Sequence, residues 1–385
     1  MDAHPGPLRG LRILEFGALG PVPFCGMLFS DLGADVLRID RENGRRYDRH
    51  SVETRGRRSL ILNLKEPRGR EIALALIEKA DALIEGFRPG VMERLGLGPR
   101  DAFVRNPKLV YGRMTGFGQT GPYARQPGHD INYVALSGAL HALGSKEKPA
   151  VPLNLIADFG GGALYLAFGV LAALRHVANG GEGQVIDCAM TDGVISTMGM
   201  IYGEHAAGRW KDARESNIID GGAHFYNNYE CADGKWISIG SIEPPFYRAL
   251  LEKLGLADDA DFADQMNRAN WPTLKRRLEA IFKTRTRDEW CALFEGSEVC
   301  FAPVLSLAEA PHHPHNVARD AFVTIDGVPQ PAPLPRFSRT PARIRHGPKP
   351  AGTGGVEALR DWGIDGKLID ALTEDLRSGH RSDGG

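Results

Sequence analysis

The chain has almost no net charge, few cysteines and no uncharged apolar run of membrane-spanning length. Its 47 basic and 48 acidic residues give a formal charge of -1, which argues against nucleic acid or an anionic membrane as a partner. The longest uncharged apolar run, Phe159–Leu174, has about 16 residues, whereas a spanning helix needs about 20. We therefore expect a buried core helix from Phe159 onward, and no membrane partner.

The five cysteines are odd in number, scattered and without a C-x-x-C motif. This pattern is typical of free thiols in a reducing compartment and not of a disulfide framework. The N-terminal residues lack the basic and apolar segments of a secretory signal, and the final residues RSDGG are not a peroxisomal signal. The sequence therefore predicts a cytoplasmic protein.

Residues 11–118 alternate between β-rich and amphipathic helical segments. Such alternation predicts parallel strands joined by crossover helices, hence a doubly wound α/β layer. The expected strands are 11–17, 34–40, 81–87 and 107–118, and the expected helices are 21–33 and 69–80.

The character of the sequence changes after residue 190. An Asp233-Gly234 turn between two alternating segments predicts a β-hairpin over 227–241, and helical segments follow it. We expect a smaller α+β domain here, then a Pro- and Gly-rich arm (329–355) and a final helix (359–376). The predicted division is a large α/β domain (1–190), a linker (191–224), the small α+β domain (225–325) and a linker with a C-terminal segment that returns to the large domain (326–385).

Two short motifs are compatible with a cofactor but lack its sequence context. Gly116–Gly121 reads G-x-G-x-x-G after a strand, as in dinucleotide-binding folds, but Pro122 and polar residues follow where a helix has to begin. A tight glycine turn beneath the active site explains the motif better than a nicotinamide site. His312, His313 and His315 are too closely spaced for one helix face and have no neighbouring cysteine, so no metal site is expected.

Arginines are concentrated after the second predicted strand. Their composition alone is typical of a solvated basic loop, whereas a position at the carboxyl ends of early strands favours a ligand that carries phosphate. Both alternatives stay open on the sequence. Arg88 and Arg94 flank a Pro-Gly turn whose backbone N–H groups can also bind phosphate. The cluster consists of Arg38, Arg41, Arg45, Arg46, Arg49, Arg55, Arg57 and Arg58.

Four polar residues at predicted element boundaries have both a structural and a catalytic interpretation. Asp158 precedes the apolar helix, so it is either an N-cap or a carboxylate beside backbone N–H donors for a developing anion. His129 and Asp130 are either a structural pair at a loop end or acid–base groups. Glu243, which precedes two prolines, is either a first-turn residue or a functional carboxylate.

Four segments of the chain, taken together, resemble one protein family. GHDINYVALSG, PLNLIADFGGG, DGGAHFYNNYECADGKW and GSIEPPFY are similar to motifs of the family III CoA-transferase (CaiB/BaiF) superfamily, in its branch that racemises alpha-methylacyl-CoA thioesters. The resemblance covers nearly the whole chain. It implies an interlocked homodimer in which a Rossmann-like large domain binds CoA without a nicotinamide cofactor. A second, smaller α+β domain then contributes to an active site at the subunit interface.

The resemblance also assigns roles to individual residues. By motif, His129 and Asp158 resemble the two opposed catalytic bases of the family, and Asp130 resembles a supporting carboxylate. Glu243 resembles the group that orients or polarises His129, from the other subunit. The residues that the resemblance assigns to substrate and CoA binding are Arg41, Leu62, Arg88, Arg94, Tyr133 and Asn154.

The implied activity is inversion of the alpha carbon of a 2-methylacyl-CoA thioester by deprotonation and reprotonation through an enolate. CoA is then part of the substrate, no cofactor is required, and the Asp158 backbone N–H is expected to donate to the enolate oxygen. The expected protein is a cytoplasmic homodimeric isomerase of branched-chain fatty acid and lipid metabolism.

Two other functions compete with the racemase interpretation. A CoA transferase of the same superfamily would use Asp158 as a nucleophile, and a non-catalytic acyl-CoA-binding protein would keep the arginines alone. His129 within GHDINY favours the racemase branch. Branched fatty acyl, sterol side-chain and 2-arylpropionyl thioesters all remain open as substrates.

Overall fold

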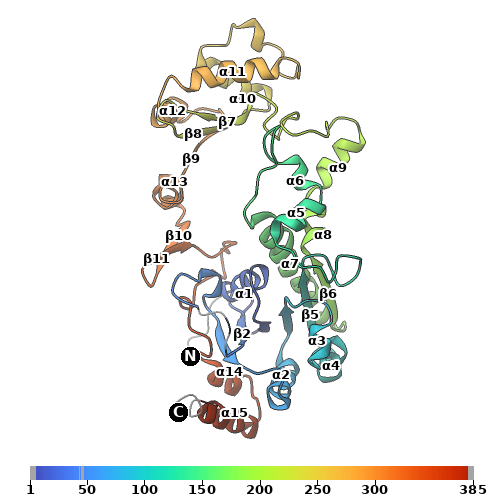
Figure 1. The fold of residues 1–385 in the computed structure, drawn as a ribbon. Helices are drawn as coiled ribbons and strands as arrows, with labels where there is room; N and C mark the ends of the chain where they lie inside the picture. Colours follow the sequence, from blue (N-terminus) through green and yellow to red (C-terminus); the bar gives the residue numbers. More distant parts are fainter. Residues whose placement is uncertain (1–5, 43, 45–46, 380–385) are drawn as a thin grey trace. The chain divides into compact units, whose positions relative to one another are not determined.

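The computed structural model describes residues 6–42, 44 and 47–379 and divides the chain into two compact units (Figure 1). Unit 1 comprises Met1–Ser137, Pro152–Thr197 and Asp320–Gly385, and unit 2 comprises Gly138–Val151 and Met198–Arg319. Each unit has its own hydrophobic core and is described separately below.

Unit 1 is built on a six-stranded sheet in which every pairing is parallel. The strand order β3-β2-β1-β4-β5-β6 is that of a doubly wound Rossmann-like fold, so the predicted fold class is confirmed. The order in which successive strands are added changes direction between β1 and β4, which creates a switch point at the carboxyl edge. The strands are β1 (Arg12–Phe16), β2 (Asp35–Asp40), β3 (Arg58–Ile61), β4 (Ala82–Glu85), β5 (Val110–Thr115) and β6 (Gln184–Ala189).

The helices of unit 1 begin where the sequence supplies helix-starting residues. α1 (Pro21–Asp31), α2 (Pro67–Lys79) and α4 (Pro99–Arg105) each begin with proline, whose missing N–H costs nothing at that position. The other helical segments are η1 (Val52–Thr54), α3 (Val91–Arg94), α5 (Asp130–Leu136), η2 (Leu155–Ala163), α7 (Leu164–Ala178), α8 (Met190–Thr197), α14 (Gly355–Asp361) and α15 (Gly366–Gly379).

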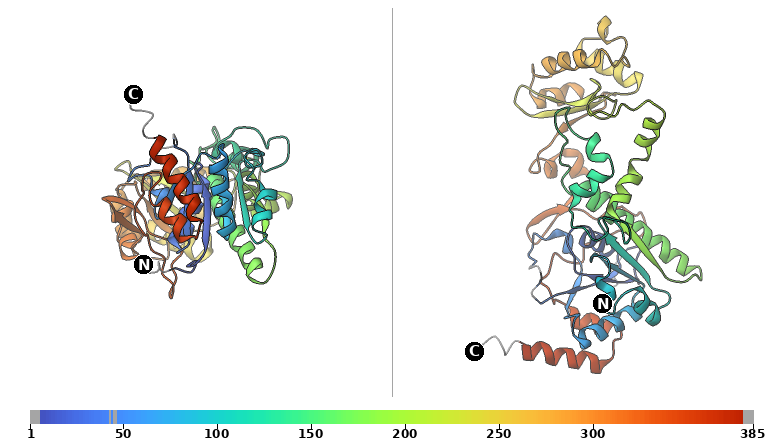
Figure 2. Two further views of the ribbon diagram at one scale, coloured as in Figure 1. Left: turned by 90° about the horizontal axis from the view of Figure 1, so that it is seen from below. Right: turned by 45° about the vertical axis from the view of Figure 1, so that its right-hand side comes forward.

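The C-terminal segment returns to the aliphatic core of unit 1. Leu359 and Trp362 pack in the same cluster as Leu76 of α2, and Figure 2 shows α14 and α15, in red, beside the blue elements of this unit. The prediction of a single helix over 359–376 is wrong. Gly363, with φ +75°, ends α14, and α15 begins three residues later.

The apolar helix is less buried than its composition predicts. α7 buries Leu166, Val170 and Ala173 and packs on β5 and β6, while much of its remaining surface is exposed. Together with η2 it forms the stretch Leu155–Ala178, the one helix in the described residues that is apolar and long enough to cross a membrane by length and composition. The predicted core helix is therefore buried along one face only.

Three of the eight arginines of the predicted basic cluster are neither solvated nor available to a ligand. They form buried ion pairs: Arg57 Nη1 lies 2.6 Å from Glu15 Oε2, Arg55 Nη2 2.6 Å from Asp31 Oδ2, and Arg38 Nε 2.7 Å from Asp40 Oδ2. Both sequence alternatives are wrong for these three, because each guanidinium is committed to a carboxylate inside the fold. Arg41 and Arg49 are exposed, Arg58 pairs with Asp35 and Asp361, and Arg45 and Arg46 lie outside the described residues.

Unit 2 contains the predicted small antiparallel sheet. The turn at Asp233-Gly234 joins two strands, and Gly234 has φ +71°, so the hairpin prediction is confirmed. The core is aromatic, with Phe225, Trp271 and Trp290 among its buried side chains. The main elements are β7 (Tyr226–Glu230), β8 (Trp236–Gly240), β9 (Phe301–Val304), α6 (Ala139–Ala142), α9 (Gly199–Ala206), α10 (Pro244–Leu254), η3 (Ala260–Phe262), α11 (Trp271–Phe282), α12 (Arg287–Phe294), η4 (Ala310–His312) and α13 (Pro314–Ala318).

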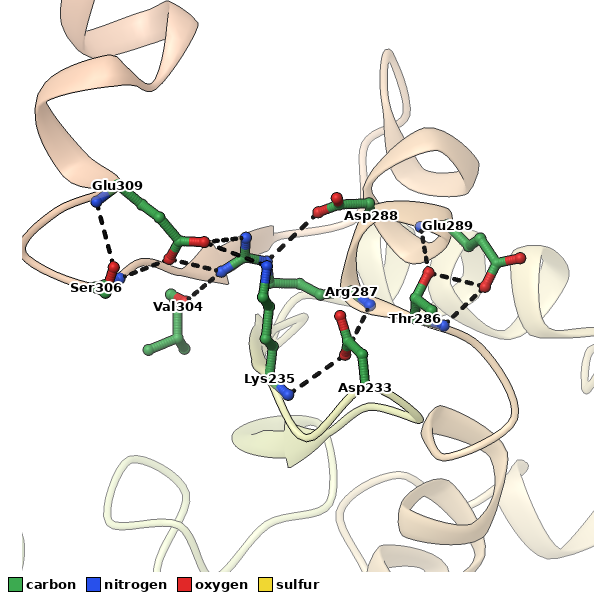
Figure 3. A network of polar contacts seen from close by, with 9 residues as sticks. All are labelled: Asp233, Lys235, Thr286, Arg287, Asp288, Glu289, Val304, Ser306 and Glu309. Atoms are coloured by element: carbon green, nitrogen blue, oxygen red, sulfur yellow. Dashed lines mark hydrogen bonds and ion pairs between the residues drawn. The ribbon is translucent and has the colours of Figure 1, made fainter.

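A polar network holds the edge of unit 2 together (Figure 3). Arg287 at the start of α12 binds both carboxylate oxygens of Glu309, at 2.7 and 3.0 Å, and donates to the carbonyl oxygen of Val304. The Arg287 backbone N–H donates to Asp233 of the hairpin turn. The network therefore fastens the hairpin turn, α12 and the chain leaving β9 to one another.

The division of the chain differs from the predicted one in three places. Residues 138–151 belong to unit 2, although they lie between two parts of unit 1. The predicted linker 191–224 contains most of α8 and the whole of α9, because apolar residues continue through it. A hairpin formed by β10 (Phe322–Ile325) and β11 (Val328–Pro331) lies in unit 1, across the predicted boundary at 325.

Candidate active site

A cavity of about 610 Å³ opens in unit 1 at the switch point of the sheet. Its walls include the turns after β1 (Gly17–Gly20), β4 (Gly86–Pro89) and β5 (Gly116 and Phe117). Ligands of doubly wound folds bind at this place, outside the carboxyl ends of the strands where the strand order reverses. The predicted site residues that line it are Arg41, Arg88, His129, Tyr133 and Asp158.

His129 lies at the N-terminal end of α5, with an exposed side chain at the cavity. Its backbone is extended, at φ -130° and ψ 175°, and is fixed on both sides by Asn132. The His129 N–H donates to Asn132 Oδ1 at 3.0 Å, and the Asn132 N–H donates to the His129 carbonyl oxygen at 2.8 Å. The imidazole therefore projects from a fixed helix start.

Asp130, the next residue, fixes the backbone of Asp158. Its side chain is 5% exposed, and its Oδ2 accepts the N–H groups of both Ala157 and Asp158 at 2.8 Å. Asp158 is the fourth residue of η2, a π-helix, which is a rare geometry that is frequent at functional sites. One carboxylate thus joins the element that carries His129 to the element that carries Asp158.

This arrangement corrects two expectations about Asp158. The N-cap of the helical stretch is Asn154, so Asp158 lies inside the first turns rather than before them. The Asp158 N–H is already donated to Asp130 and is not free for an enolate oxygen. The sequence did not reveal this, because the prediction began the helix at Phe159.

The Asp158 carboxyl lies in surroundings that favour its protonated form. Burial and the neighbouring Asp130 charge raise its pKa to about 6, while His129 and a hydrogen bond from Asn154 act in the opposite direction. The carboxylate packs against the β1–α1 turn, where a Cβ at Gly20 would lie 2.9 Å from Asp158 Oδ2. Gly20 has φ +67°, so both space and backbone geometry require glycine there.

Tyr133 shapes the cavity wall between β5 and α5. Its hydroxyl donates to the carbonyl oxygen of Gly128, and its ring lies edge-on to Phe117 with centroids 5.0 Å apart. A Cβ at Gly116 would come within 2.1 Å of the ring. Burial and the Asp158 charge raise the pKa of Tyr133 to about 12, so its hydroxyl stays protonated and serves as a donor.

The other residues predicted to bind substrate or CoA differ in their exposure and in whether they line the cavity. Arg41, Arg88 and Arg94 are exposed, and Arg94 lies on α3 outside the cavity lining. Leu62 is 2% exposed and packs in the aliphatic core, so its side chain is not available to a ligand. Asn154 is exposed and bonds to Asp158, as described above.

Glu243 belongs to unit 2, where it precedes α10 as the N-cap residue. The two residues before it are fixed by a side chain that the sequence did not single out. Gln265 Nε2 donates to the carbonyl oxygens of Ser241, at 3.0 Å, and Ile242, at 2.9 Å. The segment leading to Glu243 is therefore held from within unit 2.

The two motifs compatible with a cofactor are resolved by local geometry. Gly118 and Gly121 have φ +87° and +94°, and the Gly118 N–H donates to Thr115 Oγ1 at 2.8 Å. No helix begins at this turn in the described residues, so the predicted tight turn is confirmed.

His312 ends η4 and His315 lies in α13, and within the described part of the chain no group of three or more His, Cys, Asp or Glu residues is arranged to hold a metal ion. All five cysteines are free thiols, as predicted.

Comparisons with known proteins agree with this architecture. The family model of CoA-transferase family III matches residues 8–354. The alpha-methylacyl-CoA racemases of Mus musculus and Homo sapiens are each 44% identical to the chain, and each alignment covers 96% of both proteins. Among solved structures, a CaiB/BaiF family protein from Brucella suis matches 93% of this chain and 100% of its own with a TM-score of 0.79 and 26% identity.

Proposed function

The chain belongs to CoA-transferase family III, and from this premise we propose that it is a racemase of 2-methylacyl-CoA thioesters. The protein is an isomerase that inverts the alpha carbon of its substrate by proton transfer. The observation that carries this proposal is one cavity in unit 1, which His129, Asp158 and two exposed arginines all line. An imidazole and a carboxylate at one cavity are the pair of bases that inversion requires.

Inversion needs one group to remove the alpha proton on one face and another to return a proton on the opposite face. In one direction the Asp158 carboxylate accepts the alpha proton and the imidazolium of His129 returns one, and in the other the imidazole accepts it and the Asp158 carboxylic acid returns one. With a pKa of about 6, Asp158 is ionised at neutral pH but is a stronger base than an ordinary aspartate. Each proton transfer exchanges a carbon–hydrogen bond at the alpha carbon for an N–H bond on His129 or an O–H bond on Asp158 without a change of oxidation state, so the proposed reaction uses no redox cofactor or metal.

The thioester carbonyl is polarised as its alpha proton leaves, and the resulting enolate oxygen needs a hydrogen-bond donor. One such donor is commonly worth about 3 kcal/mol of barrier. Because the Asp158 N–H donates to Asp130, we assign that role to a group other than the Asp158 backbone.

The CoA part of the substrate supplies the binding energy. Exposed guanidinium groups at Arg41, Arg88 and Arg94 match the phosphates of CoA in charge and geometry. Tyr133 lines the channel that leads to His129 and Asp158. CoA is thus recognised as part of the substrate, and it stays attached to the acyl group through its thioester bond.

We further propose that the protein is a homodimer, with Glu243 of one subunit orienting His129 of the other. An apolar patch on η2, α7 and α8 supports association, since such exposed side chains mark interaction surfaces in soluble proteins. The exposed side chains of this patch are Leu155, Leu164, Tyr165, Phe168 and Ile195. The free thiols agree with a cytoplasmic enzyme, and the substrate class agrees with branched-chain lipid metabolism.

Exchange in deuterated water separates the proposed function from its alternatives. A single-enantiomer 2-methylacyl-CoA is incubated with the protein, and alpha-deuterium and enantiomer ratio are followed by mass spectrometry and chiral chromatography. A racemase incorporates deuterium without an acceptor acid and converges on both enantiomers. A transferase requires an acceptor and forms a new thioester, and a carrier does neither; either outcome refutes the proposal. A panel of branched, sterol and 2-arylpropionyl thioesters in the same assay identifies the acyl preference.

Subunit complementation tests the interface role of Glu243. Chains carrying His129→Ala and Glu243→Gln are co-expressed with different tags, and the mixed dimers are purified. If Glu243 acts on the partner's His129, half of the sites in a mixed dimer are intact, so roughly half of the wild-type activity returns. Activity no higher than that of either variant alone contradicts the assignment.

A further inference from the structure

One guanidinium fastens both ends of a segment that carries one of the proposed CoA-binding arginines and directly precedes another. The segment runs from Glu85, at the end of β4, to Glu93 on α3, and contains Arg88. Arg94 follows directly, and its Nη1 lies 3.2 Å from the position of a Cβ at Gly90, so its side chain folds back along the same segment.

Arg113 on β5 makes the connection. Its Nε donates to Glu85 Oε1 at 2.9 Å, and its Nη1 and Nη2 donate to the two oxygens of Glu93 at 2.7 and 3.2 Å. The other oxygen of Glu85 accepts the backbone N–H of Phe87 at 2.6 Å. The turn that leads to Arg88 is thus held from β5 on one side and from its own strand on the other.

These contacts hold the segment from outside the cavity that contains His129 and Asp158, while Arg113 and Glu93 line a second, smaller cavity beside it. Arg113 is 6% exposed and Glu85 is fully buried, and neither lines the cavity that contains His129 and Asp158. Burial raises the pKa of Glu85 to about 7, while the Phe87 N–H and Arg113 act in the opposite direction and favour the ionised form. Removing Arg113 would leave Glu85 buried with the Phe87 N–H as its remaining partner.

We propose that Arg113 is a positioning residue, which through Glu85 and Glu93 holds Arg88 and Arg94 in the orientation that binds the phosphates of CoA. The inference rests on the proposed function, in which those two arginines contact CoA. Its physical basis is that ordering long side chains before binding avoids an entropic cost at the moment of binding. A guanidinium suits the role because its planar fork reaches two carboxylates at once, which an ammonium group cannot do with the same geometry.

Glu93 provides a test in which positioning and simple charge predict opposite results. Its side chain is 45% exposed, so Glu93→Gln is tolerated more readily than a change at Glu85. Removing a negative charge near bound phosphate strengthens the binding of an anion, which lowers KM for the CoA thioester. Loss of the Arg113 connection instead releases α3 and raises KM. The sign of the change therefore distinguishes the two effects.

The matched control is Glu71→Gln. Glu71 pairs with Arg105 at 3.0 Å, and its side chain is also 45% exposed, but it lies on α2 outside both ends of the segment. KM and kcat for one CoA thioester are measured for both variants, with Tm as a check of folding. We expect Glu93→Gln to raise KM by about 2- to 10-fold with kcat within about twofold, and Glu71→Gln to leave both unchanged. An unchanged or lowered KM in Glu93→Gln overturns the inference.

Arg88→Gln and Arg94→Gln test the proposed CoA contacts separately from the positioning role of Arg113. If both raise KM but Glu93→Gln does not, the CoA assignment stands and the positioning role of Arg113 is wrong. If neither raises KM, the proposed CoA contacts are wrong and the positioning role falls with them. Arg113→Lys, which keeps the charge but not the fork, is expected to raise KM as Glu93→Gln does, and a normal KM in a folded Arg113→Lys protein contradicts the inference.

Discussion

The two units use charged residues in opposite ways. In unit 1, Arg57 and Glu15 form an ion pair in which both side chains are 0% exposed, within an otherwise aliphatic interior. In unit 2, Arg287 and Glu309 are 7% and 33% exposed, and they lie beside an aromatic core. Ion pairs inside unit 1 are part of the framework under the cavity, whereas those of unit 2 fasten segments at its edge.

The difference explains why a run of arginines predicts function poorly in this chain. Arg38, Arg55 and Arg57 lie in the same stretch of sequence as Arg41, yet only Arg41 is left for a ligand. These three guanidinium groups form buried ion pairs that stabilise the fold, so their charges are not available to a ligand. The charges that remain exposed at the cavity are the ones that bind phosphate in the proposed function.

The largest effect is expected from Asp158→Asn in unit 1, which removes a proposed catalytic base and is expected to leave the fold intact. Loss of a general base lowers deuterium exchange by up to about 10⁴-fold. Because the folded state raises the pKa of Asp158, its charged form is less stable when folded than when unfolded, so the amide is expected to raise Tm at pH 7.5. Exchange rates and thermal unfolding check both parts, and a lowered Tm would show that the carboxylate has a structural role.

Arg57→Met is expected to have the next largest effect, on the stability of unit 1. It leaves Glu15 buried and unpaired, which destabilises a protein by about 3–5 kcal/mol. Four of the five tryptophans lie in unit 2 (Trp210, Trp236, Trp271 and Trp290), so their fluorescence reports mainly on that unit. Urea unfolding followed by circular dichroism should therefore shift more than unfolding followed by fluorescence. Equal shifts would mean that the two units unfold together.

Lowering the pH should separate the two bases. Asp158 acts as a base only when ionised, so exchange from the enantiomer that it deprotonates is expected to fall through pH 6 as pH decreases, by about tenfold for each unit below the pKa. In Asp158→Asn this limb of the profile is absent. A wild-type profile for that enantiomer that stays flat from pH 7 to pH 5 contradicts the two-base mechanism.

The smallest effect is expected from Arg287→Met in unit 2. Glu309 is partly exposed and water replaces its lost partner, so we expect Tm to fall by about 2–4 °C when followed by tryptophan fluorescence. Exchange by His129 and Asp158 should be nearly unchanged. A loss as large as that of Arg57→Met would remove the distinction between the ion pairs of the two units.

The sequence predicted the parts of the fold that depend on local chemistry. Prolines at the first turns of α1 and α2, alternation of strands and helices, and the Asp233-Gly234 turn each correspond to an observed element. The break at Gly363 and the extent of η2 were missed, because apolar periodicity continues across both. The membership of residues 138–151 in unit 2 depends on tertiary packing, which no local pattern encodes.

The sequence predicted the site residues that belong to recognisable motifs, but not the long-range contacts that hold them. His129 and Asp158 came from motif resemblance, while the hydrogen bonds from Ala157 and Asp158 to Asp130 join residues almost 30 positions apart. The sequence contained one indication of the contacts that Arg113 makes. Glu85 and Arg113 are single charged residues in otherwise apolar strands, and a charge in a buried strand requires a partner.

The double hydrogen bond to Asp130 places the two proposed bases on a common support. Since α5 begins at Asp130 and η2 is held by its carboxylate, a displacement of one element carries the other with it. The gap between imidazole and carboxylate then varies less than the rest of the cavity. In the proposed mechanism the alpha carbon lies between these two groups, so a shared support for α5 and η2 keeps both bases in place for the two proton transfers.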